Sequence, residues 1–305
     1  MTKRRAVASG LVCLVMACGV AIPTTTAQQK RLKVHISVDM EGIGGVVSSE
    51  QLGPSGFEYG RAREWMTGEA LAAIAGAREA GATEIVVTDA HGNGQNLLID
   101  LLPDDVRVIR SWPRPLMMME GVDSSFAAAV FIAYHSGTAN PAGVRAHTMS
   151  SASLAGVKVN GRELPEAGVN ALIAGHFGVP VVFVSGDDAA VAETRSLVGE
   201  IDAVVVKRAI SFHSANTMTP KASQAAIRAG VKGALERRAG RRPFTMPAPY
   251  ALELTFKNYR PAEMLAYLPG ARRVSSHSVR LEARNVPELS RLIEFVMTYQ
   301  PDLAP

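Results

Sequence analysis

Residues 32–42 read LKVHISVDMEG, and this stretch decides how the rest of the sequence is interpreted. Leu32–Val38 is short and mostly apolar, which predicts a β-strand whose two faces are both covered. The strand ends in two carboxylates, Asp39 and Glu41, separated by one residue. Side chains two apart in an extended segment face the same side, so both carboxylates point toward one place. Gly42 then allows the chain to turn sharply beside them.

Similar strands recur along the sequence and alternate with helical segments. Further strands are predicted at 84–88, 128–133, 181–185, 203–207 and 250–256. Helices are predicted at 61–80, 166–177, 188–197, 220–238 and 286–299. This alternation indicates an α/β fold with a mainly parallel sheet and flanking helices. In such a sheet, functional residues gather at the carboxyl ends of the strands.

Composition divides the sequence into three parts. Residues 1–27 combine basic side chains near the start, an uncharged apolar run and small residues at the end, which is the pattern of a secretory signal peptide. Residues 28–247 hold most of the strand and helix alternation and form the predicted metal-binding catalytic domain. A stretch rich in arginine and proline leads into residues 248–305, for which we expect a smaller C-terminal α+β unit.

The signal accounts for much of the charge and for all of the cysteine. The full chain of 305 residues has a net charge of +4 and two cysteines. Loss of Lys3, Arg4 and Arg5 with the signal lowers the net charge to +1, and Cys13 and Cys18 are lost as well. The remaining chain has no thiol for a disulfide, a zinc ligand or a nucleophile, and no basic patch for nucleic acid. Any metal site must therefore use carboxylates and imidazoles.

These features predict an exported protein, either periplasmic or secreted. The apolar run is short for a membrane span and is interrupted by small residues, so we expect cleavage and no stable span. The alternative is a lipid anchor on Cys18, because the residues before it loosely resemble a lipoprotein cleavage site.

Two histidines follow other predicted strands. His91 and His135 each lie just past an apolar run. Because the carboxyl ends of parallel strands lie at one edge of a sheet, both imidazoles are expected near Asp39 and Glu41. Neutral imidazole and carboxylate, without thiolate, form the ligand set of hydrolytic zinc or manganese sites. The strand ends therefore predict a metal site.

A third cluster contributes His147 and Glu166. Asn160-Gly161 lies between them and predicts a β-hairpin. Glu166 opens the helix at 166–177, where it is either a further metal ligand or a carboxylate that interacts favourably with the helix dipole. No apolar strand leads into His147, so we expect this side chain on a loop, free to act on substrate.

Three further polar residues are candidates for contacting the substrate. Asn170 follows Glu166 on the same helix, and Asp187 and Asp188 lie at the turn after the strand predicted at 181–185. These side chains could orient a free amino group of the substrate or a metal ligand. Helix capping is the alternative for the two aspartates.

In their order and spacing these segments resemble the metal-dependent D-aminopeptidases of the DppA type, peptidase family M55. The resemblance extends from Val34 to the last predicted helix. It is carried by Ser37–Gly42, Asp89–His91, Ala133–His135, His147–Met149, Glu166–Asn170 and Val184–Asp188.

The resemblance implies a site and an assembly. Residues that match the family's binuclear zinc ligands are Asp39, which bridges both metals, and Glu41, His91, His135 and Glu166. The residue that matches His147 is implied as the nucleophile or catalytic base. A ring-like homo-oligomer, a decamer, and release of N-terminal D-residues from short peptides are also implied.

We interpret the chain as a metal-dependent aminopeptidase that hydrolyses short peptides, with two divalent ions, zinc foremost, activating water. His147 is assigned to proton transfer, since a metal-activated hydroxide makes a separate nucleophile unnecessary. Another binuclear metallohydrolase, a phosphoesterase or an amidase, could use the same ligands, because a ligand set determines the metal chemistry and not the substrate. An exported peptide-binding protein would also have an α/β fold, but it would not need five convergent ligands.

Overall fold

The fold is taken from a computed structural model that describes residues 1–3 and 31–299. The predicted signal peptide, residues 1–27, lies outside the described residues apart from its first three, and so do the last six residues of the predicted C-terminal unit. Within the described ranges, no helix is long and apolar enough to cross a membrane.

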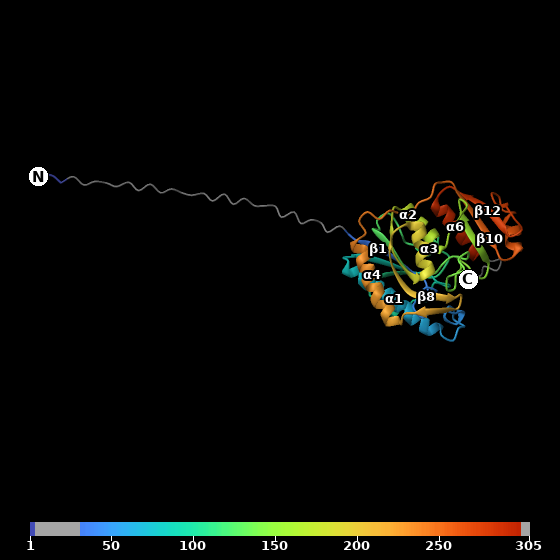
Figure 1. The fold of residues 1–305 in the computed structure, drawn as a ribbon. Helices are drawn as coiled ribbons and strands as arrows, with labels where there is room; N and C mark the ends of the chain where they lie inside the picture. The colour runs from blue at the N-terminus through green and yellow to red at the C-terminus, as the bar shows by residue number, and fades with distance from the viewer. Residues whose placement is uncertain (4–30, 300–305) are drawn as a thin grey trace. The chain divides into compact units, whose positions relative to one another are not determined.

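A seven-stranded sheet forms the centre of the fold (Figure 1). Its strand order is β3-β2-β1-β4-β7-β8-β9, and all neighbouring strands are parallel except β8 and β9. The strands are β1 (Lys33–Val38), β2 (Glu84–Asp89), β3 (Arg107–Ile109), β4 (Ala128–Tyr134), β7 (Val181–Asp187), β8 (Asp202–Ser211) and β9 (Ser214–Thr217). The predicted α/β class is confirmed, whereas β3 and β9 were not predicted.

Helices cover both faces of this sheet, which explains why its central strands are buried and mostly apolar. Helices α1 (Tyr59–Glu79) and α4 (Pro220–Glu236) pack together on one face, and α2 (Glu166–His176) and α3 (Asp188–Val198) lie on the other (Figure 1). The side chains of successive residues in β4 point to opposite faces of the sheet. Val130 and Ile132 pack in the core on the α1 side, and Phe131 packs in the core on the α2 side.

A second, antiparallel sheet has the order β11-β12-β10-β5-β6. Its strands are β5 (Leu154–Val159), β6 (Arg162–Glu163), β10 (Tyr250–Phe256), β11 (Arg272–Arg273) and β12 (Ser278–Ala283). Strands β5 and β6 form the hairpin predicted at Asn160-Gly161, where both residues have positive φ, 52° and 78°. Helices α5 (Tyr259–Leu265) and α6 (Val286–Thr298) pack against β10 and β12. The second sheet thus takes strands from both sides of residue 247, so it is not confined to the predicted unit at 248–305.

Short 3₁₀ helices complete the described elements; they are η1 (Ser49–Gln51), η2 (Ile99–Leu101) and η3 (Met117–Met119). Helix η3 packs against β1 and β2 on the face that carries α2. It brings methionine side chains close to the carboxyl ends of these strands, which is where the candidate site lies.

The direction of winding reverses between β1 and β4. From β1 the chain proceeds outward to β2 and β3, and from β4 it proceeds the other way to β7 and β8. The segments that follow β1 and β4 lead to helices on opposite faces, α1 and α2. Such a reversal is the topological switch point at which open α/β sheets bind ligands.

Gly42 allows the two central strands to meet closely at this point. Its N–H donates a hydrogen bond to the carbonyl of Ala133 at 2.7 Å. A Cβ on Gly42 would lie 2.2 Å from the carbonyl carbon of Ala133, which is closer than real Cβ contacts. Any larger residue would therefore push the loop that carries Asp39 and Glu41 away from β4.

Candidate metal centre

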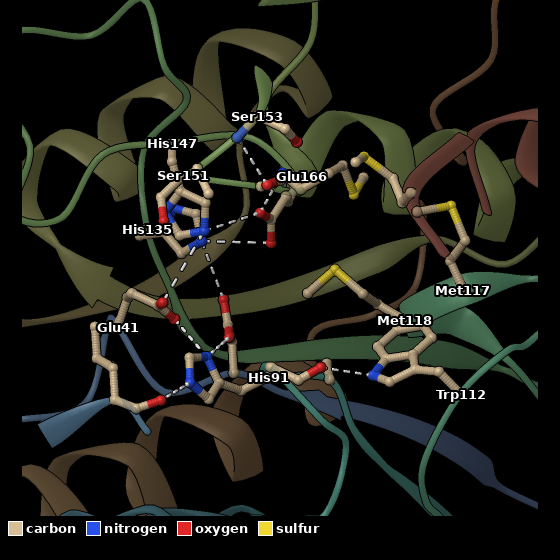
Figure 2. Close-up of a pocket in the computed structure, with 18 of the residues that line it drawn as sticks. Glu41, His91, Trp112, Met117, Met118, His135, His147, Ser151, Ser153 and Glu166 are labelled. Atoms are coloured by element: carbon tan, nitrogen blue, oxygen red, sulfur yellow. Dashed lines mark hydrogen bonds and ion pairs between the residues drawn. The ribbon is translucent and has the colours of Figure 1, made fainter. Parts of the chain in front are cut away.

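Six titratable side chains from five segments converge at the switch point (Figure 2). All five predicted metal ligands and the predicted catalytic histidine are among them: Asp39 and Glu41 after β1, His91 after β2, His135 after β4, His147 on a loop, and Glu166 at the start of α2. All are buried except His147, which is partly exposed.

The Asp39 carboxylate lies between two pairs of ligands. On one side, His91 Nδ1 lies 3.3 Å from Asp39 Oδ1 and 2.9 Å from Glu41 Oε2. On the other side, His135 Nε2 lies 3.3 Å from Asp39 Oδ2 and 3.4 Å from Glu166 Oε2. The two oxygens of Asp39 therefore face two different histidines, an arrangement that suits a carboxylate shared by two cations.

Each histidine of the site is anchored through the ring nitrogen that points away from it. The contacts are His91 Nε2 with the Leu52 carbonyl (2.8 Å), His135 Nδ1 with the Ser136 carbonyl (3.0 Å) and His147 Nδ1 with the Arg145 carbonyl (2.8 Å). A carbonyl oxygen only accepts, so the anchored nitrogen is the one that carries the proton. In the neutral ring the other nitrogen then turns a lone pair toward the carboxylates. Metal-binding histidines are oriented in this way.

The cluster fits a metal because it is rich in buried electron-pair donors. Asp39 Oδ2, Glu41 Oε2 and His135 Nε2 are buried and have no hydrogen-bond partner among the described residues. Burial, together with the neighbouring charge of Glu41, raises the pKa of Asp39. Buried polar atoms without partners are costly, and a divalent cation would satisfy all three at once. Carboxylate and imidazole are ligands that zinc accepts.

The histidine pKa values point the same way. Burial alone would lower the pKa of His91, but the negative charges of Glu41 and Asp39 outweigh burial and raise it well above its ordinary value. The same balance, with Glu166 and Asp39 as the charges, raises the pKa of His135. The carboxylates thus attract positive charge to the ring nitrogens, and either protons or metal ions can provide it.

His147 differs from the other two histidines in its surroundings. Its ring stacks on His135 with the centroids 4.0 Å apart. Its Nε2 lies 4.0 Å from Glu41 Oε1 and 3.7 Å from Glu166 Oε1, and its side chain is 14% exposed, compared with 1% for His135. The loop therefore presents His147 at the edge of the cluster, as predicted, where it can reach a bound molecule.

The cluster opens into a cavity of about 440 Å³, a volume in the range of small-molecule sites. Figure 2 shows Met117, Met118 and Trp112 on the far side of the site from His147. The apolar part of the cavity wall includes Trp112, Met117, Met118, Met149 and Met297. Methionine side chains adapt to ligands of different shape, so this wall suits variable apolar side chains.

The three predicted substrate contacts have other roles, and none of them lines the cavity. Asn170 Nδ2 donates to the hydroxyl of Tyr134 at 2.9 Å in the core. Asp187 caps α3, since its Oδ1 accepts a backbone N–H of the first turn at 2.7 Å. Asp188 faces Arg208, with 3.9 Å between their charged atoms. Capping, the alternative interpretation, therefore explains Asp187, and the structure gives no support for substrate contacts by the three residues.

Lys207 is a residue of the site that the sequence analysis missed. It is 2% exposed, and its ammonium donates hydrogen bonds to the backbone carbonyls of Glu41, Ile43 and Val46. Burial lowers its pKa to about 8, although nearby carboxylates, Asp187 foremost, oppose the shift. Lys207 thus holds the loop that carries Glu41 in place. The only signal in the sequence was a lysine at the end of an apolar strand.

A buried cluster of carboxylates and imidazoles, placed at the switch point of a parallel sheet and beside a ligand-sized cavity, defines a metallohydrolase type of site. The chain belongs to the D-aminopeptidase family, Peptidase M55, whose family model matches residues 32–295. The predicted family and enzyme class, a metallo-aminopeptidase, are therefore confirmed.

Two relatives show how far the similarity extends. A D-aminopeptidase of Bacillus subtilis (strain 168) is 33% identical over 261 residues, which cover 84% of this chain and 93% of that protein. The solved structure described as the Zn-dependent D-aminopeptidase DppA from Bacillus subtilis, a self-compartmentalizing protease, matches with a TM-score of 0.83 and 31% identity. That match covers 88% of this chain and 99% of the other, so both sheets of the fold belong to the similarity.

Replacement of Lys207 by methionine tests its role in holding the loop. Lys207→Met leaves three buried carbonyls without their donor, so we expect the free energy of unfolding to fall by about 3 kcal/mol and zinc to bind more weakly. Lys232→Met is the control, because Lys232 lies on the surface of α4 in an exposed pair with Glu236. Urea unfolding and zinc titration measure both effects. Equal stability and zinc affinity of the two variants would contradict the role of Lys207.

Proposed function

We propose that the protein is an exported D-aminopeptidase that hydrolyses short peptides at a binuclear zinc centre. The observation that carries the proposal is the position of Asp39, whose two oxygens face His91 and His135 separately. Glu41 completes one ligand set and Glu166 the other. Membership of the D-aminopeptidase family supports the substrate class, and the zinc dependence of the Bacillus subtilis relative supports the metal.

Zinc ions bound here would polarise the scissile carbonyl and make hydroxide available at neutral pH. His147 then acts as general base and general acid. Its Nδ1 proton is held by the Arg145 carbonyl, so Nε2 is the atom that accepts a proton from water and delivers it to the leaving amine. The carboxylates of Glu41 and Glu166, 4.0 and 3.7 Å from Nε2, stabilise the imidazolium formed between these two steps.

The cavity favours a peptide over a phosphate ester. A phosphoryl group needs several cationic or N–H donors around its oxygens. Apart from histidines, Arg145 is the one basic side chain among the described residues that line this cavity, and much of the opposite wall is methionine and tryptophan. That wall fits the side chains of a peptide. A binding protein without catalysis would not need His147 beside five ligands.

Assembly and location complete the proposal. The structural relative is described as a self-compartmentalizing protease, which supports a homo-oligomer, and we extend this to a ring of ten chains by family resemblance. Exposed apolar side chains on the β8–β9 hairpin, Ile210 at 71% and Phe212 at 41%, provide surface for such contacts. The signal pattern of residues 1–27 supports a periplasmic or secreted enzyme, with a lipid anchor on Cys18 as the alternative.

The function is tested with the zinc-loaded protein on three substrates: D-Ala-D-Ala, L-Ala-L-Ala and 4-nitrophenyl phosphate. We expect release of D-alanine from the first, little release from the second and no phosphate from the third. A chelator should abolish activity and zinc should restore it. Faster turnover of the L-peptide would refute the D-specificity, and phosphate release would favour the phosphoesterase.

His147→Ala tests the division between ligands and catalyst. We expect this variant to keep its zinc and to lose turnover by about 10²- to 10⁴-fold, because proton transfer contributes an effect of that size. His91→Ala is the comparison, since loss of a ligand should lower the zinc content as well. Zinc content and kcat are measured on both variants. Loss of zinc from His147→Ala to the same extent would make His147 a ligand.

A further inference from the structure

Arg145 lines the active-site cavity on the loop that carries the catalytic histidine. Its backbone is held on both sides. The N–H donates to the Phe212 carbonyl at 3.0 Å, and the carbonyl accepts from His147 Nδ1 at 2.8 Å. Two residues span at most about 7 Å of chain, so the backbone of Arg145 lies within that distance of the backbone of His147.

The guanidinium of Arg145 has no anionic partner within residues 31–299. Its Nε is buried and has no hydrogen-bond partner among the described residues. The carboxylates of Asp39, Glu41 and Glu166 pair with histidines in the part of the chain described, and none pairs with Arg145. The ring of Phe212 lies 5.0 Å from the guanidinium carbon and supports one face of the group. The N–H groups at the edge of the guanidinium remain available to donate hydrogen bonds to a ligand.

Another arginine of the chain shows how a structural arginine differs. Arg114 is buried and lies two residues after Trp112, which lines the cavity. Its guanidinium donates hydrogen bonds to the backbone carbonyls of Ser111 and Asp89. Those carbonyls hold Arg114 within the fold, although its Nη1, like Arg145 Nε, is buried without a hydrogen-bond partner among the described residues. Arg145 has no comparable contact among the described residues, although it also is partly buried and faces the cavity. A buried donor without a partner calls for an explanation, and an anionic ligand provides one.

We propose that Arg145 binds the C-terminal carboxylate of a dipeptide substrate. The inference rests on the proposed aminopeptidase function, because only then is the bond after the first residue placed at His147. In a dipeptide the carboxylate lies one residue beyond that bond, at most about 3.6 Å of chain. The planar fork of a guanidinium binds a carboxylate through two parallel hydrogen bonds.

Three peptides separate the possible sources of the carboxylate. D-Ala-D-Ala has a free C-terminus, and D-Ala-D-Ala amide has none. D-Ala-D-isoglutamine has a blocked C-terminus and a free side-chain carboxylate. For the zinc-loaded enzyme we expect kcat/KM to be about 10- to 100-fold higher for D-Ala-D-Ala than for its amide, the usual effect of a hydrogen-bonded charge.

Arg145→Gln should lower kcat/KM for D-Ala-D-Ala to the level of the amide while the zinc content stays unchanged. Arg145→Lys, which keeps the charge but not the fork, should retain part of the preference. Arg208→Gln is the matched control, because Arg208 lies on β8 with its side chain 73% exposed and outside the cavity lining. This control should keep the full preference for the free carboxylate.

Equal turnover of D-Ala-D-Ala and its amide by the unmodified enzyme overturns the inference. So does an Arg145→Gln variant that keeps the preference, or turnover of D-Ala-D-isoglutamine as fast as that of D-Ala-D-Ala. Hydrolysis of none of the three peptides overturns the proposed function as well. Equal hydrolysis of acid and amide leaves the aminopeptidase function standing, so the two failures are distinguishable.

Discussion

The mutual repulsion of three buried carboxylates is the constraint on which this structure depends. Asp39, Glu41 and Glu166 are each at most 5% exposed and meet at one point of the sheet. Like charges in a medium of low dielectric constant repel strongly unless positive charge compensates them. Protons on the imidazoles or bound cations can provide this charge, and when the imidazoles act as neutral ligands the cations provide it. A buried lysine, Lys207, and a close glycine contact at Gly42 hold the backbone around this point.

The register of the sheet brings the ligands to one level. Val38 at the end of β1 pairs with Asp89 of β2 and with Ile132 of β4. Asp39 and His91 therefore follow their strands at almost the same height, with His135 on the other side. Since the chain leaves β1 and β4 toward opposite faces, a space remains between the two segments, and His147 and Glu166 complete the site there. The fold determines which side chains meet, and their chemistry determines what the site can bind.

The local part of this arrangement was predictable from the sequence, because each ligand near β1, β2 and β4 directly follows an apolar strand. Strands and the hairpin at Asn160-Gly161 depend on neighbouring residues, and those strands that were predicted lie within a few positions of the observed ones. Contacts between distant residues were not predictable in the same way. Nothing near Leu154–Val159 indicates pairing with Tyr250–Phe256, and nothing near Lys207 indicates three carbonyl partners more than 150 residues away. Polarity at a strand end was also ambiguous, because the sequence left both a substrate contact and helix capping open for Asp187, which caps a helix in the structure.

The number and position of the metal ions are the most direct test of the claim that Asp39 joins two ligand sets. Crystals of the zinc-loaded protein, measured with X-rays at the zinc absorption edge, give anomalous peaks wherever zinc is bound. Two peaks per chain are expected, one toward Glu41 and His91 and the other toward His135 and Glu166, with Asp39 contacting both. A single peak, zinc outside this cluster, or no zinc at all would contradict the binuclear centre.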